Sequence, residues 1–133
     1  MCQITIDDKE IFYTISNIKL VKSNGKTASS FSIAYKDFIK LYLEVNVSDA
    51  GYVPPNVFQP YYELWVNGEL SQADTFVNRY TPIDEQSSSC LIRVGTAGEH
   101  FTDGNYELTI KVFDTPAERK PDFVSSVMFN IEP

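Results

Sequence analysis

Histidine and cysteine are scarce in this sequence, and their scarcity limits its chemistry. The 133 residues include one histidine and two cysteines. Zinc needs a cluster of Cys and His ligands, which this chain cannot supply. The serines at 87–89 and His100 lack the rigid presentation and oxyanion donors that nucleophilic catalysis requires. We therefore predict no catalytic residue, no metal site and no cofactor, and we expect a protein that is not an enzyme.

Loop carboxylates leave calcium as an alternative to the expectation of no metal. Asp49, Asp114, Glu118 and Asp122 lie in predicted loops that share one end of a sandwich. Calcium prefers oxygen ligands, but these residues match neither an EF-hand nor a glycine-rich calcium repeat. We interpret them as solvated surface carboxylates.

Basic residues are also few: 11 Lys and Arg face 18 Asp and Glu, for a net charge of -7. Nucleic acids attract clustered Lys and Arg, and only Arg119 and Lys120 are adjacent here, so we predict no nucleic-acid partner. No apolar run approaches the roughly 20 residues of a transmembrane segment. The start lacks a secretory signal. We expect a cytoplasmic protein if Met1 is the native start, and an extracytoplasmic one if a signal was removed.

The two cysteines, Cys2 and Cys90, leave two readings open. They could form one disulfide, but a chain of this length buries a core without one. We expect two free thiols, with Cys90 acting as a small core residue.

Strand patterns dominate the chain. Apolar residues alternate with polar ones over 39–47, 106–112 and 127–131, which is the period of a strand with one buried face. Shorter stretches repeat the pattern through Phe31, Ile33 and Tyr35, and over 90–94. Near the start, the inward residues change from odd to even positions around Asn17, which predicts a bulge or break.

Turn signals separate these stretches at 23–26, 66–69 and 102–105. Two longer connections, 48–60 and 114–122, contain prolines and are typical of loops that serve binding. No linker or repeat divides the chain, so we predict one domain over residues 1–133. About seven to nine short strands indicate an all-β, two-layer antiparallel β-sandwich or a barrel.

Two segments resemble immunoglobulin-like domains. The stretch 103–108, with Tyr106, resembles their tyrosine corner, and 61–68 resembles their third strand, which carries a Trp before an Asn-Gly turn. Leu43 and Leu108 stand roughly where those domains have a disulfide. The resemblance implies an immunoglobulin-like sandwich, with a jelly roll as the alternative, and it implies no particular function.

The strand beginning at Tyr61 permits two orientations. If its aliphatic side is the core, then Tyr61, Glu63 and Trp65 face outward, where aromatic rings beside a carboxylate can stack on sugars. If it follows the immunoglobulin pattern, Trp65 points inward. The first orientation makes these three residues candidates for carbohydrate binding.

We expect a non-enzymatic module that binds another protein through its end loops or an edge strand. The loops carry residue types that interfaces favour. A carbohydrate-binding module and a structural subunit of a surface or particle assembly are the alternatives. The candidate protein-binding residues are Tyr52, Asn56, Phe58 and Arg119.

The loop hypothesis predicts that Tyr52→Ala or Phe58→Ala leaves the fold intact and abolishes partner binding, because truncation removes aromatic contact area without touching the core. Circular dichroism checks the fold, and a titration with the partner checks binding. Unchanged binding by both variants would exclude this loop.

Overall fold

The described part of this chain forms ten β-strands in a computed structural model, and alternating apolar residues mark most of them. The structure describes residues 2–6, 8–47, 60–77, 80–83 and 87–133. Within these ranges, no helix has the length and hydrophobicity needed to span a membrane. In chain order the strands are β1 (Gln3–Ile6), β2 (Lys9–Val21), β3 (Ser30–Ser32), β4 (Phe38–Val47), β5 (Tyr61–Val66), β6 (Glu69–Thr75), β7 (Tyr80–Pro82), β8 (Ser87–Thr96), β9 (Gly104–Phe113) and β10 (Phe123–Glu132).

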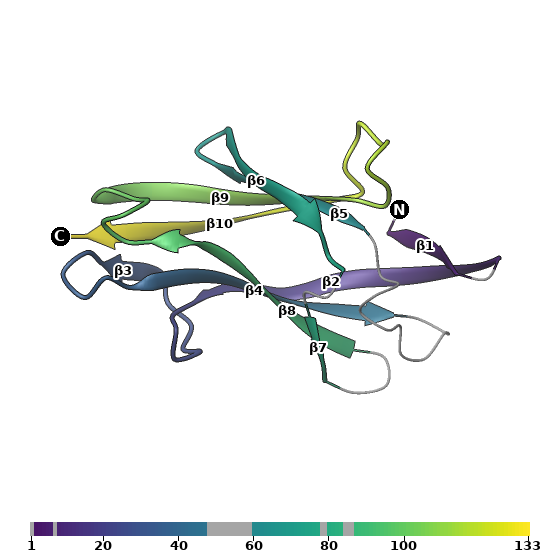
Figure 1. Cartoon of the computed structure of the whole chain (residues 1–133), viewed down its shortest axis with the longest axis horizontal. Helices are drawn as coiled ribbons and strands as arrows, with labels where there is room; N and C mark the ends of the chain where they lie inside the picture. Colours follow the sequence, from purple (N-terminus) through teal and green to yellow (C-terminus); the bar gives the residue numbers. More distant parts are fainter. Residues whose placement is uncertain (1, 7, 48–59, 78–79, 84–86) are drawn as a thin grey trace.

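The strands form two sheets packed as a sandwich (Figure 1). One sheet has the order β1-β2-β4-β8-β7, and the other has the order β3-β10-β9-β5-β6. The arrangement β2-β4-β8-β7 opposite β10-β9-β5-β6 matches the A-B-E-D and G-F-C-C′ strands of variable-type immunoglobulin domains. Among the described strands, β3 runs parallel to β10 and the other pairs are antiparallel. The predicted immunoglobulin-like sandwich is confirmed, and the strand order is not that of a jelly roll.

The core lies between the sheets and takes alternate residues from the strands. In β4, every second residue of 39–47 is buried. Leu43 and Leu108 are fully buried, so aliphatic packing occupies the core that a disulfide spans in antibody domains. Full burial of one such side chain contributes about 1.5–3 kcal/mol. Cys2 and Cys90 are not joined by a disulfide, and Cys90 packs in the core.

A β-bulge changes the inward face of β2, as the shift in its hydrophobic pattern predicts. The register between β2 and β4 shifts between Ser16 and Lys19, and Asn17 has a φ of 51°. Asn enters this left-handed region more readily than most residues. Before the bulge Ile15 points inward, and after it Leu20 does. Lys19 consequently lies on the outer face.

The strand expected through Phe31, Ile33 and Tyr35 is wrong in its second half. Only 30–32 form β3, and Tyr35 is 84% exposed. The backbone N–H of Lys36 donates to the carbonyl of Ile33 at 3.0 Å, and Lys36 has a φ of 51°. This turn ends the strand, although the apolar alternation continues through it.

The tyrosine corner is present at the start of β9. The hydroxyl of Tyr106 donates to the backbone carbonyl of Thr102 at 2.9 Å, which ties the strand to the preceding turn. Its ring stacks on Phe129 with centroids 5.3 Å apart and meets the edge of Phe101 at 5.2 Å. The resemblance to immunoglobulin-like domains therefore extends to this hydrogen bond.

Replacing Tyr106 by Phe should lower the free energy of unfolding by about 1 kcal/mol, because it removes one hydrogen bond and keeps the packed ring. Urea unfolding followed by fluorescence measures the change. Tyr35→Phe is the matched control, since Tyr35 is 84% exposed and should show almost no change. Equal losses in both variants would contradict a role for the corner.

Candidate binding surface

β5 presents three side chains on the outer face of its sheet. Tyr62 and Leu64 are fully buried, so the alternating residues Tyr61, Glu63 and Trp65 face away from the core. All three are half-buried by neighbours on that face. The residues proposed from the sequence as an aromatic platform therefore do share one surface.

The alternative orientation, with Trp65 in the core, is wrong. Tyr62 occupies the interior instead, and its ring centroid lies 5.1 Å from that of Phe76, which is also fully buried. Turning Trp65 inward would also turn Tyr62 outward, because adjacent residues of a strand point to opposite faces. The aliphatic pattern of β5 was the better guide than its resemblance to an immunoglobulin strand.

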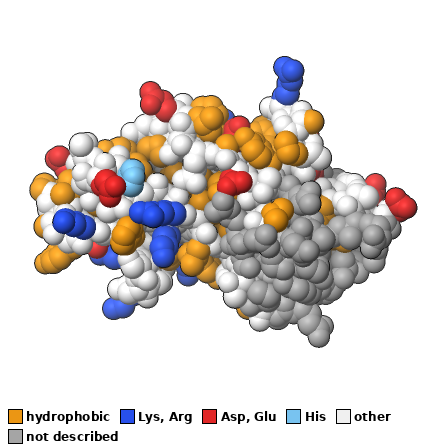
Figure 2. Space-filling view, in the orientation of Figure 1, with side chains coloured by type: hydrophobic (Ala, Val, Ile, Leu, Met, Phe, Trp, Pro, Cys, Tyr) orange, Lys and Arg blue, Asp and Glu red, His pale blue; other side chains and the backbone are white. Residues whose placement is uncertain are grey.

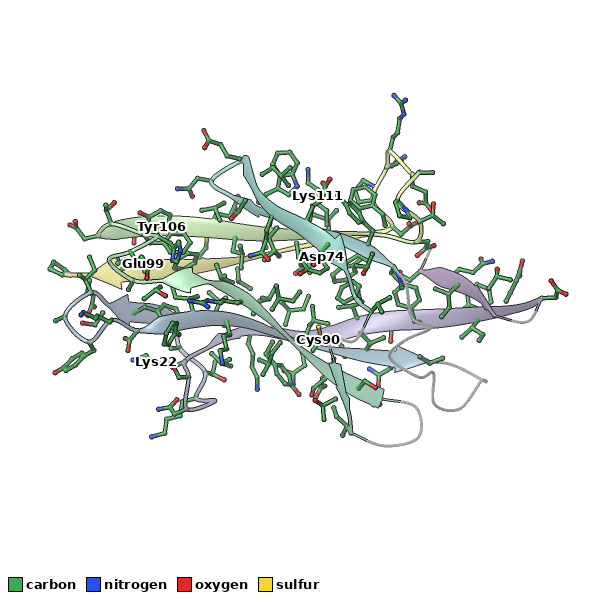
Figure 3. All side chains as sticks on the ribbon, in the orientation of Figure 1. Lys22, Asp74, Cys90, Glu99, Tyr106 and Lys111 are labelled. Atoms are coloured by element: carbon green, nitrogen blue, oxygen red, sulfur yellow. The ribbon has the colours of Figure 1, made fainter. Side chains whose placement is uncertain are left out.

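Trp65 is held between two charged side chains. Its indole N–H donates to Oε1 of Glu63 at 3.0 Å, and the ammonium of Lys111 lies 4.2 Å from its ring centroid. Glu63 and Lys111 are direct cross-strand partners on β5 and β9 (Figure 3 labels Lys111). An exposed cation–π contact of this kind is worth about 0.5–1 kcal/mol. Together the two charges fix the indole on the surface and partly neutralise each other.

Apolar and hydroxyl side chains surround this cluster. Leu70 of β6 is the cross-strand partner of Trp65 and is 53% exposed. On the other side, Thr109 of β9 pairs with Trp65 in register, and its hydroxyl lies 2.8 Å from that of Ser126. Met128, on β10, is also mostly exposed. We call this surface the Trp65 face; it consists of Tyr61, Glu63, Trp65, Leu70, Thr109, Lys111, Val124, Ser126 and Met128.

A groove of about 450 Å³ lies beside this face, between the β5–β6 hairpin and the end of β8. Its lining includes Glu69, Leu70 and His100, the single histidine, seen in pale blue in Figure 2. The Nδ1 atom of His100 accepts the backbone N–H of Thr96 at 2.9 Å. The histidine of a catalytic triad instead donates from Nδ1 to a carboxylate, so His100 is not arranged as such a base.

The tip at 114–122 brings three carboxylates together. Ligand atoms of Asp114, Glu118 and Asp122 lie within 4.8 Å of one another, so three of the four loop acids grouped from the sequence converge. The fourth, Asp49, lies outside the described residues. Tyr13 donates its hydroxyl to Asp114 at 2.6 Å. Burial raises the pKa of Asp114, and a hydrogen bond to Asp122 raises the pKa of Glu118.

Of the four protein-binding residues proposed from the sequence, the structure describes Arg119 alone. Arg119 is exposed on the same tip. Tyr52, Asn56 and Phe58 lie outside the described residues, so their relation to Arg119 stays a prediction. Among the described residues, the Trp65 face brings together three of the predicted site residues, Tyr61, Glu63 and Trp65.

Comparisons with known proteins give distant likenesses. No protein-family model and no curated protein matches this chain. The crystal structure of the CARDB domain of the PF1109 protein from Pyrococcus furiosus, in complex with di-metal ions, has a TM-score of 0.49 at 9% identity, covering 90% of this chain and 94% of that chain. The solution structure of the same domain has a TM-score of 0.46 at 9% identity, covering 90% and 95%. The CooA pilin subunit of enterotoxigenic Escherichia coli has a TM-score of 0.24 at 15% identity, covering 89% and 100%. The fold therefore rests on the sheet order described above.

The three carboxylates at the tip 114–122 lead to a prediction about the pKa of Glu118. Glu118 should titrate above its ordinary pKa of 4.5, and Asp122→Asn should bring it back toward that value by removing the carboxylate partner. A raised pKa means that the folded chain binds more protons than the unfolded chain just above pH 4.5, so this group's contribution to stability falls as the pH rises. Carboxyl NMR titration measures the shift. A control change, Glu107→Gln, should leave Glu118 unaffected, and an unaltered Glu118 in Asp122→Asn would contradict the assignment.

Proposed function

We propose that this chain is a non-enzymatic module that binds another folded protein through the Trp65 face. The observation that carries the proposal is the indole of Trp65, fixed on the solvent side of the sheet by Glu63 and Lys111. A side chain ordered before binding loses little conformational entropy on contact. Trp is also among the residues that most often dominate interface energies.

The surroundings of Trp65 favour a protein partner over a sugar. A sugar stacks on an open ring face and uses nearby polar groups as hydrogen-bond partners. Here Lys111 lies over the indole and Glu63 accepts its N–H. The exposed aliphatic residues Leu70 and Met128 extend the contact area, and hydroxyls lie between them, a mixture that suits a flat protein surface.

The sheet face is also a better contact surface than the sheet edges. The β6 edge is irregular at Ser71, where its register with β5 shifts between Leu64 and Trp65, and the carboxylate of Asp74 accepts the backbone N–H of Thr75 at 2.8 Å. Bulges and edge charges both hinder the addition of another strand. The strands β3 and β7 have only three residues each. These features weigh against assembly by edge pairing.

Leu70→Lys should weaken partner binding roughly 30-fold or more, because it puts a charge beside a central contact residue. A photo-cross-linking amino acid at position 70 identifies the partner, and a titration with that purified partner measures the affinity. Leu91→Lys is the matched control: it makes the same change on the opposite sheet at a site with 50% exposure, against 53% for Leu70.

Two results would overturn the proposal. The first is an equal loss of affinity in both lysine variants, or none in Leu70→Lys. The second is a change in Trp65 fluorescence on adding a glycan, with no protein cross-linked at position 70. That result would favour the carbohydrate-binding alternative, and it is readable because the chain has one tryptophan.

A further inference from the structure

Positive charge is concentrated in one segment of this acidic chain. Residues 19–40 hold five of the eight lysines and one aspartate, a local net charge of +4 in a chain of net charge -7. The segment includes the end of β2, the following turn and the start of β4. Strand pairing then brings Lys19 and Lys40 together on the outer face of the sheet opposite the Trp65 face.

Three of these lysines line one surface hollow of about 290 Å³. Lys19 and Lys22 come from β2 and the turn, and Lys40 comes from β4. Val21, which is almost fully buried, is part of the lining between them. The remaining lining residues are Ser23, Gly25, Tyr42 and Leu91.

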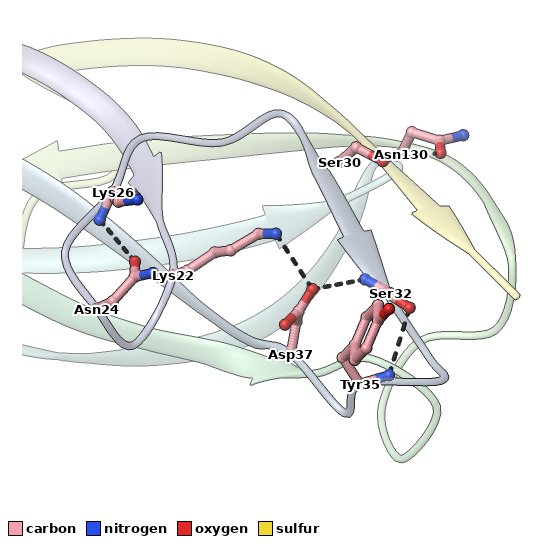
Figure 4. Close-up of polar contacts among 8 residues, drawn as sticks. All are labelled: Lys22, Asn24, Lys26, Ser30, Ser32, Tyr35, Asp37 and Asn130. Atoms are coloured by element: carbon pink, nitrogen blue, oxygen red, sulfur yellow. Dashed lines mark hydrogen bonds and ion pairs between the residues drawn. The ribbon is translucent and has the colours of Figure 1, made fainter.

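The charges of Lys19 and Lys40 are available to a ligand. The ammonium of Lys19 lies 4.9 Å from the ring centroid of Tyr42, which orients it without neutralising it. Lys22 is paired with Asp37 at 3.5 Å, and Asp37 also accepts the backbone N–H of Ser32 at 2.8 Å (Figure 4). Among the described residues, neither Lys19 nor Lys40 has a carboxylate within ion-pairing distance. Asp37 is thus occupied by Lys22 and a backbone N–H.

We propose that this hollow binds the phosphate or sulfate group of a small organic ester. Lys ammonium groups act as point charges with three rotatable donors each, and a phosphate or sulfate monoester offers them three acceptor oxygens where a carboxylate offers two. The hydroxyl of Ser23 adds a hydrogen-bond donor. The ring of Tyr42 and the side chain of Leu91 give the organic part an apolar wall. This site is independent of the protein-binding function proposed above.

Phenyl phosphate is the probe, because its ester oxygen joins a tetrahedral anion to an aromatic ring. In NMR titrations of the full chain, it should shift the amide signals around Lys19, Lys40 and Tyr42, and inorganic phosphate should shift them at higher concentration. Lys19→Gln and Lys40→Gln should each weaken phenyl phosphate binding by about ten-fold, since each removes one charge-assisted contact. Lys120→Gln is the matched control, as it removes the same charge from the distant tip at 114–122.

The controls separate a defined site from general attraction to positive charge. Equal weakening in Lys120→Gln, or equal affinity for benzoate and phenyl phosphate, would overturn the proposal. Thermal unfolding of each variant checks that the fold is retained. Co-sedimentation with phosphatidylcholine vesicles containing phosphatidic acid distinguishes the source of the ester: binding that is lost in the double variant Lys19→Gln, Lys40→Gln supports a lipid headgroup. Binding of phenyl phosphate without vesicle binding supports a soluble ester, and absence of both overturns the site.

Discussion

Burial of alternate side chains between two sheets is the constraint on which the surfaces of this protein depend. Once Tyr62 and Leu64 enter the core, Glu63 and Trp65 must face solvent. A half-exposed indole is costly to leave in water. Its N–H donates to Glu63, and the Lys111 ammonium lies over its ring. The Trp65 face is therefore a consequence of core packing, with an arrangement of charges built around it.

The bulge in β2 has the same kind of consequence on the other sheet. Without the bulge at Asn17, the odd-numbered positions would stay inward, and Lys19 would enter the core. An unpaired lysine in an apolar interior costs far more than a single buried methylene gains. The register shift places Leu20 in the core and Lys19 over Tyr42. Local backbone conformation thus decides both a core position and a surface charge.

Much of the fold was predictable because its causes are local. Alternation over 39–47 and 106–112 predicted β4 and β9, and the sequence around Tyr106 predicted a corner that the hydrogen bond to Thr102 confirms. The position of Tyr35 was mispredicted because a turn ends the strand, while apolar and polar residues go on alternating in the sequence. The contacts of Trp65 and the lysine hollow were not predictable, because they depend on the register between strands distant in sequence.

Net charge says little about the local charge of a surface for the same reason. A value of -7 averages over the whole chain, whereas a ligand responds to charges within about 8–10 Å at physiological ionic strength. Strand pairing collects Lys19, Lys22 and Lys40 on one outer face, while Glu63 and Lys111 offset each other on the other. The two faces are separated by a close-packed core, and packed sheets lie about 10 Å apart. Substitutions that distant, with no shared contacts, usually act additively. Each face can therefore be altered without the other, so the two binding surfaces proposed above can be tested independently.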